Sequence, residues 1–214
     1  MSSACGGSSS TACILRDIHA EVVDVHVASS TSPVYVVLVL PKVGPFVQAL
    51  GTLPSHTVAR TYSEWRQLYK TLLNVSNSTR RTACTCVLGS CPFWTMHLIV
   101  QSIPFPRKEL FRWRRSPDLL QARKRALAHF VTTVVAKLQI YRPEIFDSSR
   151  TFSASSASNQ SCCRFLRTLE TFLGLDDDAI VRQFTSVSHK SRLQLTLEGW
   201  HSHRRNLFCL SASA

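Results

Sequence analysis

The chain has 214 residues, 44% of them hydrophobic and 18% charged, and it carries a formal net charge of +12. This hydrophobic content is enough for a packed core and excludes wholesale disorder, while the longest apolar run, residues 34–40, is far shorter than the roughly 20 residues that span a bilayer. The excess of cations predicts an anionic partner, such as nucleic acid, an acidic membrane surface or an acidic protein.

The first segment, residues 1–12, is rich in serine and glycine and is predicted to be disordered. It has neither a cationic start nor an apolar stretch, so we expect no secretory signal. The chain is therefore expected to be intracellular and soluble, with its cysteines reduced.

Three stretches have the character of β-strands: residues 18–28, 34–40 and 56–60. In the first stretch Val23, Val25 and Val27 alternate with polar residues, which predicts a half-buried strand. The second is almost wholly apolar, and loops with proline and glycine or serine separate the three. Neighbouring strands of this kind predict an antiparallel meander.

Three helices are expected further along the chain: residues 61–73, 118–139 and 162–173. The apolar residues of each recur at helical spacing. Ser63 is a candidate N-cap for the first helix, Ser116-Pro117 is a suitable start for the second, and Gly174 is a candidate C-cap for the third. Three strands followed by three or four helices predict an α+β fold.

The positive charge is concentrated in residues 103–125, where eight cations face two acidic residues and supply half of the net charge. This segment also contains the large apolar side chains Phe111 and Trp113 among its cations. The charge is therefore a local patch, which favours a surface that binds an extended anionic partner.

Four motifs occur in a recognisable order: RTYSEW at residues 60–65, PFPRK at 104–108, RKRAL at 123–127 and CCRFLRTLETFLGL at 162–175. Together they resemble the phox-homology (PX) domain, the phosphoinositide-binding module of the sorting-nexin type, over residues 13–175. The resemblance implies a three-stranded antiparallel sheet packed against a helical subdomain of three to four helices. Residues 176–214 would form a basic, partly ordered C-terminal tail.

The resemblance also implies a lipid site between the strand-to-helix junction, the proline loop and the long helix. Tyr62 would stack beneath the inositol ring, Lys108 would reach the 1- or 4-phosphate, and Arg123 would fork the inositol hydroxyls. These roles suit the side chains, because a guanidinium presents paired donors and an ammonium presents a compact charge.

In the same family the loop after the prolines meets the bilayer. Phe111 and Trp113 are therefore expected to insert into the membrane, and Arg112, Arg114 and Arg115 are expected to attract acidic lipids. This expectation accounts for the mixture of aromatic and cationic residues in the basic segment.

One position departs from the family. Its main ligand for the 3-phosphate is an arginine, and Thr61 stands there in this chain. Thr61 can donate only a neutral hydrogen bond, which is weaker than a charge-assisted one. The preceding Arg60 points to the opposite face of an extended strand and could substitute only through a bulge. Two interpretations stay open: phosphoinositide binding that is weak or altered in preference, and a protein-interaction adaptor of the same fold.

Other functions find little support in the sequence. Cys84, Cys86 and Cys91 with His97 do not have the spacing of a common zinc site, and no catalytic motif or nucleic-acid-binding pattern is evident. We therefore expect no enzyme activity, cofactor, metal or nucleic-acid partner. The expected protein is cytoplasmic and peripheral on endosomal or other phosphoinositide-bearing membranes, with protein partners as a further expectation.

Overall fold

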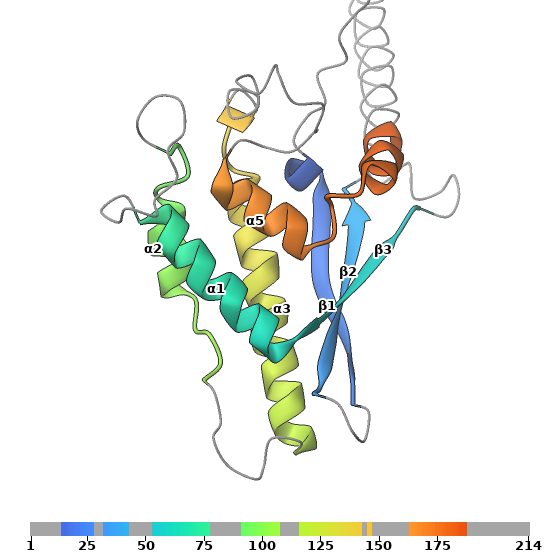
Figure 1. Cartoon of the computed structure of the whole chain (residues 1–214), viewed down its shortest axis with the longest axis vertical. Helices are drawn as coiled ribbons and strands as arrows, with labels where there is room; N and C mark the ends of the chain where they lie inside the picture. The colour runs from blue at the N-terminus through green and yellow to red at the C-terminus, as the bar shows by residue number, and fades with distance from the viewer. Residues whose placement is uncertain are drawn as a thin grey trace, which may run out of the picture.

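The computed structural model of the chain describes residues 14–27, 32–42, 53–77, 91–107, 116–142, 145–146 and 163–187. Its strands are β1 (Ile18–His26), β2 (Val34–Pro41) and β3 (His56–Thr61). They form one antiparallel sheet in the order β1-β2-β3 (Figure 1). The predicted meander is confirmed, and the alternation of side chains along each strand explains why one face of the sheet is available for packing.

The buried face of β1 differs from the prediction, because a β-bulge interrupts the strand between Val22 and Asp24. Before the bulge Ile18, Ala20 and Val22 are buried, whereas Val23 is 39% exposed. A bulge adds a residue to one strand and shifts the alternation of side chains beyond it. The valine pattern therefore identified the strand but not its inner face.

The helices are α1 (Tyr62–Ser76), α2 (Met96–Ser102), α3 (Pro117–Leu138) and α5 (Arg164–Phe172), with a short 3-10 helix η1 (Ile14–Arg16) before β1 and a further helical stretch at residues 178–187. The three predicted helices are confirmed. No local pattern predicted α2, which has seven residues and no side-chain cap. The fold is α+β, as predicted.

The sheet is covered by α3, which packs along β1 (Figure 1). Thr132 and Gln139 of α3 donate hydrogen bonds of 3.2 and 2.6 Å to the backbone carbonyls of Ala20 and Ile18. Among the helices, α1 packs against both α2 and α5. None of the helices within the described residues is long and apolar enough to cross a membrane.

One core joins the sheet to the helices. Its largest contributions come from apolar side chains at helical or alternating spacing, as expected for amphipathic elements. The main members are Tyr35, Val37 and Val39 of β2, Trp65, Leu68 and Leu72 of α1, Leu127, Phe130, Val131 and Leu138 of α3, and Phe165, Leu166 and Leu169 of α5.

A glycine ends α5 and turns the chain back toward the core. Gly174 has a φ of +67°. The N–H of Leu175 donates a hydrogen bond to the carbonyl oxygen of Glu170, and the N–H of Gly174 donates one to the carbonyl oxygen of Thr171. This pairing is a Schellman motif, which favours glycine at the left-handed position. A Cβ at Gly174 would also lie 2.6 Å from His56 Nε2. The predicted cap is confirmed.

The ordered unit extends beyond residue 175, where the sequence predicted the tail to begin. Val181 and Phe184, in the helical stretch 178–187, are buried in the same core. At least this part of the tail therefore belongs to the domain. The strand pattern at residues 193–197 and the serine-rich segment 1–12 lie outside the described residues.

Candidate functional site

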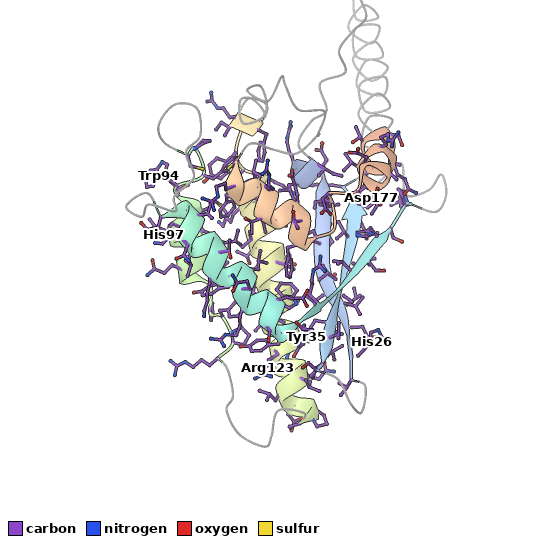
Figure 2. The ribbon with its side chains drawn as sticks, in the orientation of Figure 1. His26, Tyr35, Trp94, His97, Arg123 and Asp177 are labelled. Carbon is purple, nitrogen blue, oxygen red and sulfur yellow. The ribbon has the colours of Figure 1, made fainter. Side chains whose placement is uncertain are left out.

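The chain passes from strand to helix at one end of the sheet. Thr61 ends β3 opposite Val34 of β2, and Tyr62 begins α1. The next residue of β2, Tyr35, lies close to Arg123 of α3, as Figure 2 shows. Side chains of β2, α1 and α3 therefore meet at this junction.

Tyr62 and Arg123, which the resemblance assigned to one ligand site, are in direct contact. The Cζ atom of Arg123 lies 4.3 Å from the centre of the Tyr62 ring, a distance at which a guanidinium is attracted to an aromatic face. The Tyr62 hydroxyl donates a hydrogen bond of 2.5 Å to the carbonyl oxygen of Pro106. The junction, the proline loop and the long helix thus come together as the resemblance implied.

Arg123 is a buried cation. The residue is only 6% exposed, and its Nε has no hydrogen-bond partner among the described residues. A charged group that is buried without full hydrogen bonding is costly. The ring of Tyr62 offsets part of this cost, and an oxygen ligand on the guanidinium would offset more.

Tyr35 is a second buried polar group at the same place. The residue is 0% exposed, and its hydroxyl has no hydrogen-bond partner of good geometry among the described residues. Burial raises the pKa of Tyr35, and the positive charge of Arg123 opposes this rise. The hydroxyl is therefore protonated at neutral pH. We did not predict Tyr35 as a site residue, because its hydroxyl is the only polar side-chain group in an otherwise apolar stretch of the sequence.

The proline loop is fixed at its base by aromatic stacking. Phe105 stacks on Tyr69 with ring centres 4.5 Å apart, and it meets Phe130 edge-on at 5.4 Å. Its ring centre is also 6.4 Å from that of Tyr62. Offset and edge-to-face pairs of this kind stabilise contacts beyond their buried area. The loop is thereby positioned over the same face of α1 and α3 that holds the site.

Thr61 caps α1. Its hydroxyl donates a hydrogen bond of 2.7 Å to Glu64 Oε2 and accepts one of 3.3 Å from the Glu64 N–H. The backbone N–H of Thr61 donates to the same carboxylate oxygen at 2.7 Å. These contacts are a capping box. The prediction that Ser63 is the N-cap is therefore wrong, and the hydroxyl that we expected to bind a phosphate has a different partner.

The capping box leads to a prediction on stability and pH. Replacing Thr61 with alanine is expected to destabilise the protein by about 1 kcal/mol at neutral pH, because the N-cap side chain is lost. Partial burial acts to raise the pKa of Glu64, but hydrogen bonds from Thr61 and the charge of Arg60 outweigh it and lower the pKa below the ordinary 4.5. Stability from such a carboxylate is present above pH 4.5 and is lost as the pH falls through the lowered value.

Urea unfolding of wild type and Thr61→Ala at a series of pH values measures this contribution. The difference in unfolding free energy is expected to narrow as the pH falls from neutral to about 3. Thr61→Ser, which keeps the hydroxyl, is the matched control and should resemble wild type. A difference that is independent of pH would show that the hydrogen bond from the Thr61 hydroxyl to the Glu64 carboxylate contributes nothing to stability, because the backbone N–H of residue 61 donates to this carboxylate in both proteins.

Arg60 ties β3 to the end of α5. Its Nε and Nη2 donate hydrogen bonds of 2.9 and 3.1 Å to the carbonyl oxygens of Phe172 and Thr171, and its Nη1 lies 3.8 Å from Glu64 Oε1. A cation is favourable at the carbonyl end of a helix. Arg60 is directed to the end of α5 and not to Tyr62 and Arg123, as expected from its place in the strand.

The remaining candidate residues follow the proline loop in the sequence. Lys108 and the residues expected to meet the membrane lie outside the described residues: Phe111, Arg112, Trp113, Arg114 and Arg115. Arg107 is the last described residue before this segment, and Ser116 is the first after it. The roles assigned to the residues of this segment therefore stay predictions.

Cys91 and His97, two of the residues considered as metal ligands, have different partners in the structure. Cys91 Sγ lies 3.7 Å from Cys163 Sγ, at the start of α5, whereas His97 Nδ1 is 3.2 Å from the carbonyl of Leu73. No group of three or more potential metal ligands occurs within the described part of the chain. Cys84 and Cys86 lie outside it.

Comparisons with known proteins give no match: no protein-family model, no curated protein and no solved structure matches this chain.

Proposed function

We propose that the chain is a phosphoinositide-binding, peripheral membrane-targeting module of the PX type, acting in endosomal trafficking or signalling. The observation that carries this proposal is the buried guanidinium of Arg123 over the ring of Tyr62, beside the Tyr35 hydroxyl. A guanidinium and a protonated phenol both donate hydrogen bonds, so the site favours a ligand with several acceptor oxygens. A phosphorylated inositol ring is such a ligand.

The basic segment after the proline loop would supply most of the membrane affinity. Inserting Phe111 and Trp113 is worth roughly 1.5–3 kcal/mol each if they are fully buried, and each of three or four nearby cations adds about 1 kcal/mol against acidic lipid. The gross gain is about 6–10 kcal/mol before ordering costs, compared with about 8 kcal/mol for micromolar affinity. Salt-sensitive membrane binding is therefore feasible even with a weakened headgroup site.

Selectivity for the 3-phosphate is expected to be low. The position that supplies its main ligand in the family is Thr61, whose hydroxyl is bonded to Glu64. A threonine whose hydroxyl caps a helix contributes neither a charge nor a free hydrogen-bond donor to the ligand. The module would thus recognise an acidic, phosphoinositide-containing surface more than one particular isomer.

A vesicle panel tests the proposal. The full chain is mixed with phosphatidylcholine vesicles that contain each phosphoinositide in turn, at low and physiological salt, and binding is measured by flotation. Arg123→Gln is expected to weaken binding to the preferred lipid by about 10- to 100-fold, because hydrogen bonds to a charged group contribute roughly 1.5–3 kcal/mol. Arg167→Gln, which removes an exposed charge from α5, is the matched control and should bind nearly as wild type does.

Two outcomes would overturn the proposal. The first is binding to phosphoinositide vesicles that equals binding to neutral vesicles at low salt. The second is an equal loss in Arg123→Gln and Arg167→Gln, with both variants folded by circular dichroism. Arg123→Lys adds a finer comparison, because it keeps the charge but loses the paired donors of the guanidinium.

A protein-interaction adaptor of the same fold is the second candidate function. The observation that favours it is the use of Thr61 as a helix cap at the position where the family binds phosphate. A hollow of about 360 Å³ between α1 and α5, lined by side chains that include Glu64, Leu68 and Phe172, offers a surface away from Tyr62. This function predicts no difference among lipids and partner binding that survives Arg123→Gln.

A further inference from the structure

The face of α1 next to the candidate site carries two cations in line with Tyr62. Arg66 and Lys70 follow Tyr62 at spacings of four and eight residues, so the three side chains form one row along the helix. Side chains on a helix lean toward its N-terminus. Lys70 therefore leans toward Arg66, and Arg66 leans toward Tyr62 and the start of α1.

This row, which we call the Arg66–Lys70 row, borders a small hollow. The hollow has a volume of about 140 Å³ and is lined by Tyr62, Ser63, Arg66, Gln67 and Lys70. Tyr62 lines this hollow and also contacts Arg123, so the two places adjoin at one side chain. The hydrogen bond from Tyr62 to Pro106 keeps the proline loop, with the exposed Arg107 after it, beside the same tyrosine.

The positive charge of the row is not neutralised by the described part of the protein. The ion pairs there join His19 to Glu21, His26 to Asp24 and Arg60 to Glu64, and none of them includes Arg66 or Lys70. Like charges four residues apart on a helix repel each other. The nearest acid in sequence, Glu64, binds Thr61 and Arg60 and lines the hollow beside α5 instead.

We propose that Arg66 and Lys70 form a second anion subsite, which takes a phosphomonoester of the ligand whose ring lies at Tyr62 and Arg123. The inference rests on the proposed function, and it deepens it by naming a multiply phosphorylated inositol as the ligand class. A guanidinium and an ammonium four residues apart can contact different oxygens of one phosphate. The subsite would supply, from the next turns of α1, the charge that Thr61 lacks.

The test uses the full chain and a double variant, Arg66→Gln with Lys70→Gln. Its matched control is Arg167→Gln with Lys137→Gln, which removes the same charge from exposed positions on α5 and α3. Binding is measured to phosphatidylcholine vesicles with a phosphatidylinositol bisphosphate, and to vesicles brought to the same charge with phosphatidylserine. The double variant of the row is expected to lose about tenfold in affinity for the bisphosphate vesicles. Its loss of affinity for the phosphatidylserine vesicles is expected to be no greater than that of the control variant.

Soluble ligands separate the two sources of the phosphate. Inositol bisphosphate and inorganic phosphate are titrated against the same proteins by calorimetry. Binding of inositol bisphosphate that depends on Arg66 and Lys70 would assign the subsite to the headgroup itself. Dependence seen only with vesicles would assign it to the lipid in its membrane. Tight binding of inorganic phosphate without binding of inositol bisphosphate would overturn the assignment to an inositol ligand.

The inference and the proposed function fail in different ways. Equal losses for the row and control variants, with Arg123→Gln still defective, would overturn the second subsite and leave the proposed function intact. Absence of phosphoinositide binding in wild type would overturn both. Thermal melting checks the fold, and the row variant is expected to melt no lower than wild type, because the substitution removes repulsion between like charges.

Discussion

Replacing Trp65 with alanine is expected to lower the free energy of unfolding by about 3–5 kcal/mol, the cost of deleting a large buried aromatic side chain. Trp65 is 0% exposed. Its ring meets Phe172 of α5 edge-on with centres 4.7 Å apart and Phe130 of α3 at 6.4 Å. The side chain thus joins three helices, and its removal leaves a cavity at their meeting point.

Urea unfolding followed by circular dichroism measures this loss. Trp65→Phe is the matched control and should cost much less, because it keeps an aromatic ring and removes an indole N–H that has no partner among the described residues. Equal losses in the two variants would contradict the expectation that an aromatic ring at residue 65 stabilises this part of the core by its packing.

Replacing Arg60 with methionine is the second change with a large expected effect. It should destabilise the protein by about 1.5–3 kcal/mol, because two charge-assisted hydrogen bonds to carbonyl oxygens at the end of α5 are lost. Methionine keeps an apolar stem of similar reach, so the change isolates the guanidinium. At temperatures where the variant is folded, binding to phosphoinositide vesicles is expected to be unchanged.

Thermal melting and vesicle flotation on the same samples separate these effects. Arg60→Lys keeps the charge near Glu64 but cannot reproduce both bonds to α5, so an intermediate loss of stability is expected. Retained stability with lost lipid binding in Arg60→Met would contradict the structural role and place Arg60 in the ligand site. The pairing of Arg60→Met with Arg123→Gln thus distinguishes the two arginines by stability and by binding.

The larger elements could be predicted from the sequence because their patterns are local. The β-branched runs mark all three strands, and the apolar residues Leu127, Phe130 and Leu138 mark the buried side of α3. The short helix α2 lacks both a cap and a full amphipathic repeat, so it depends on tertiary packing that no local pattern reveals.

Errors at the ends of elements have specific causes. The sequence Thr61-x-x-Glu64 is a capping-box pattern, and it should have been preferred to Ser63 as the N-cap. Val181 and Phe184 were assigned to the C-terminal tail because the resemblance ends at residue 175, yet two apolar residues at spacing three are enough to bury one side of a short helix.

The candidate site was only partly predictable. The resemblance led to Tyr62 and Arg123, which lie together, and strand geometry correctly separated Arg60 from them. Tyr35 was missed because the alternation along β2 predicts that its side chain is buried but not which side chain of α3 lies beside it. That depends on how α3 crosses the sheet, and the crossing is a tertiary property.

The capping box at Thr61 has a consequence for how binding energy is used. Because the threonine and Glu64 fix the first turn of α1 through their own hydrogen bonds, this turn loses its conformational entropy when the protein folds, not when a ligand arrives. Ordering on association is one of the main terms that reduce affinity. For the headgroup ligand that we propose, a junction that is already rigid would let the contacts of Tyr62 and Arg123 count almost fully toward the affinity. Replacing Thr61 with arginine would add a charge but would also remove the hydroxyl that caps the helix.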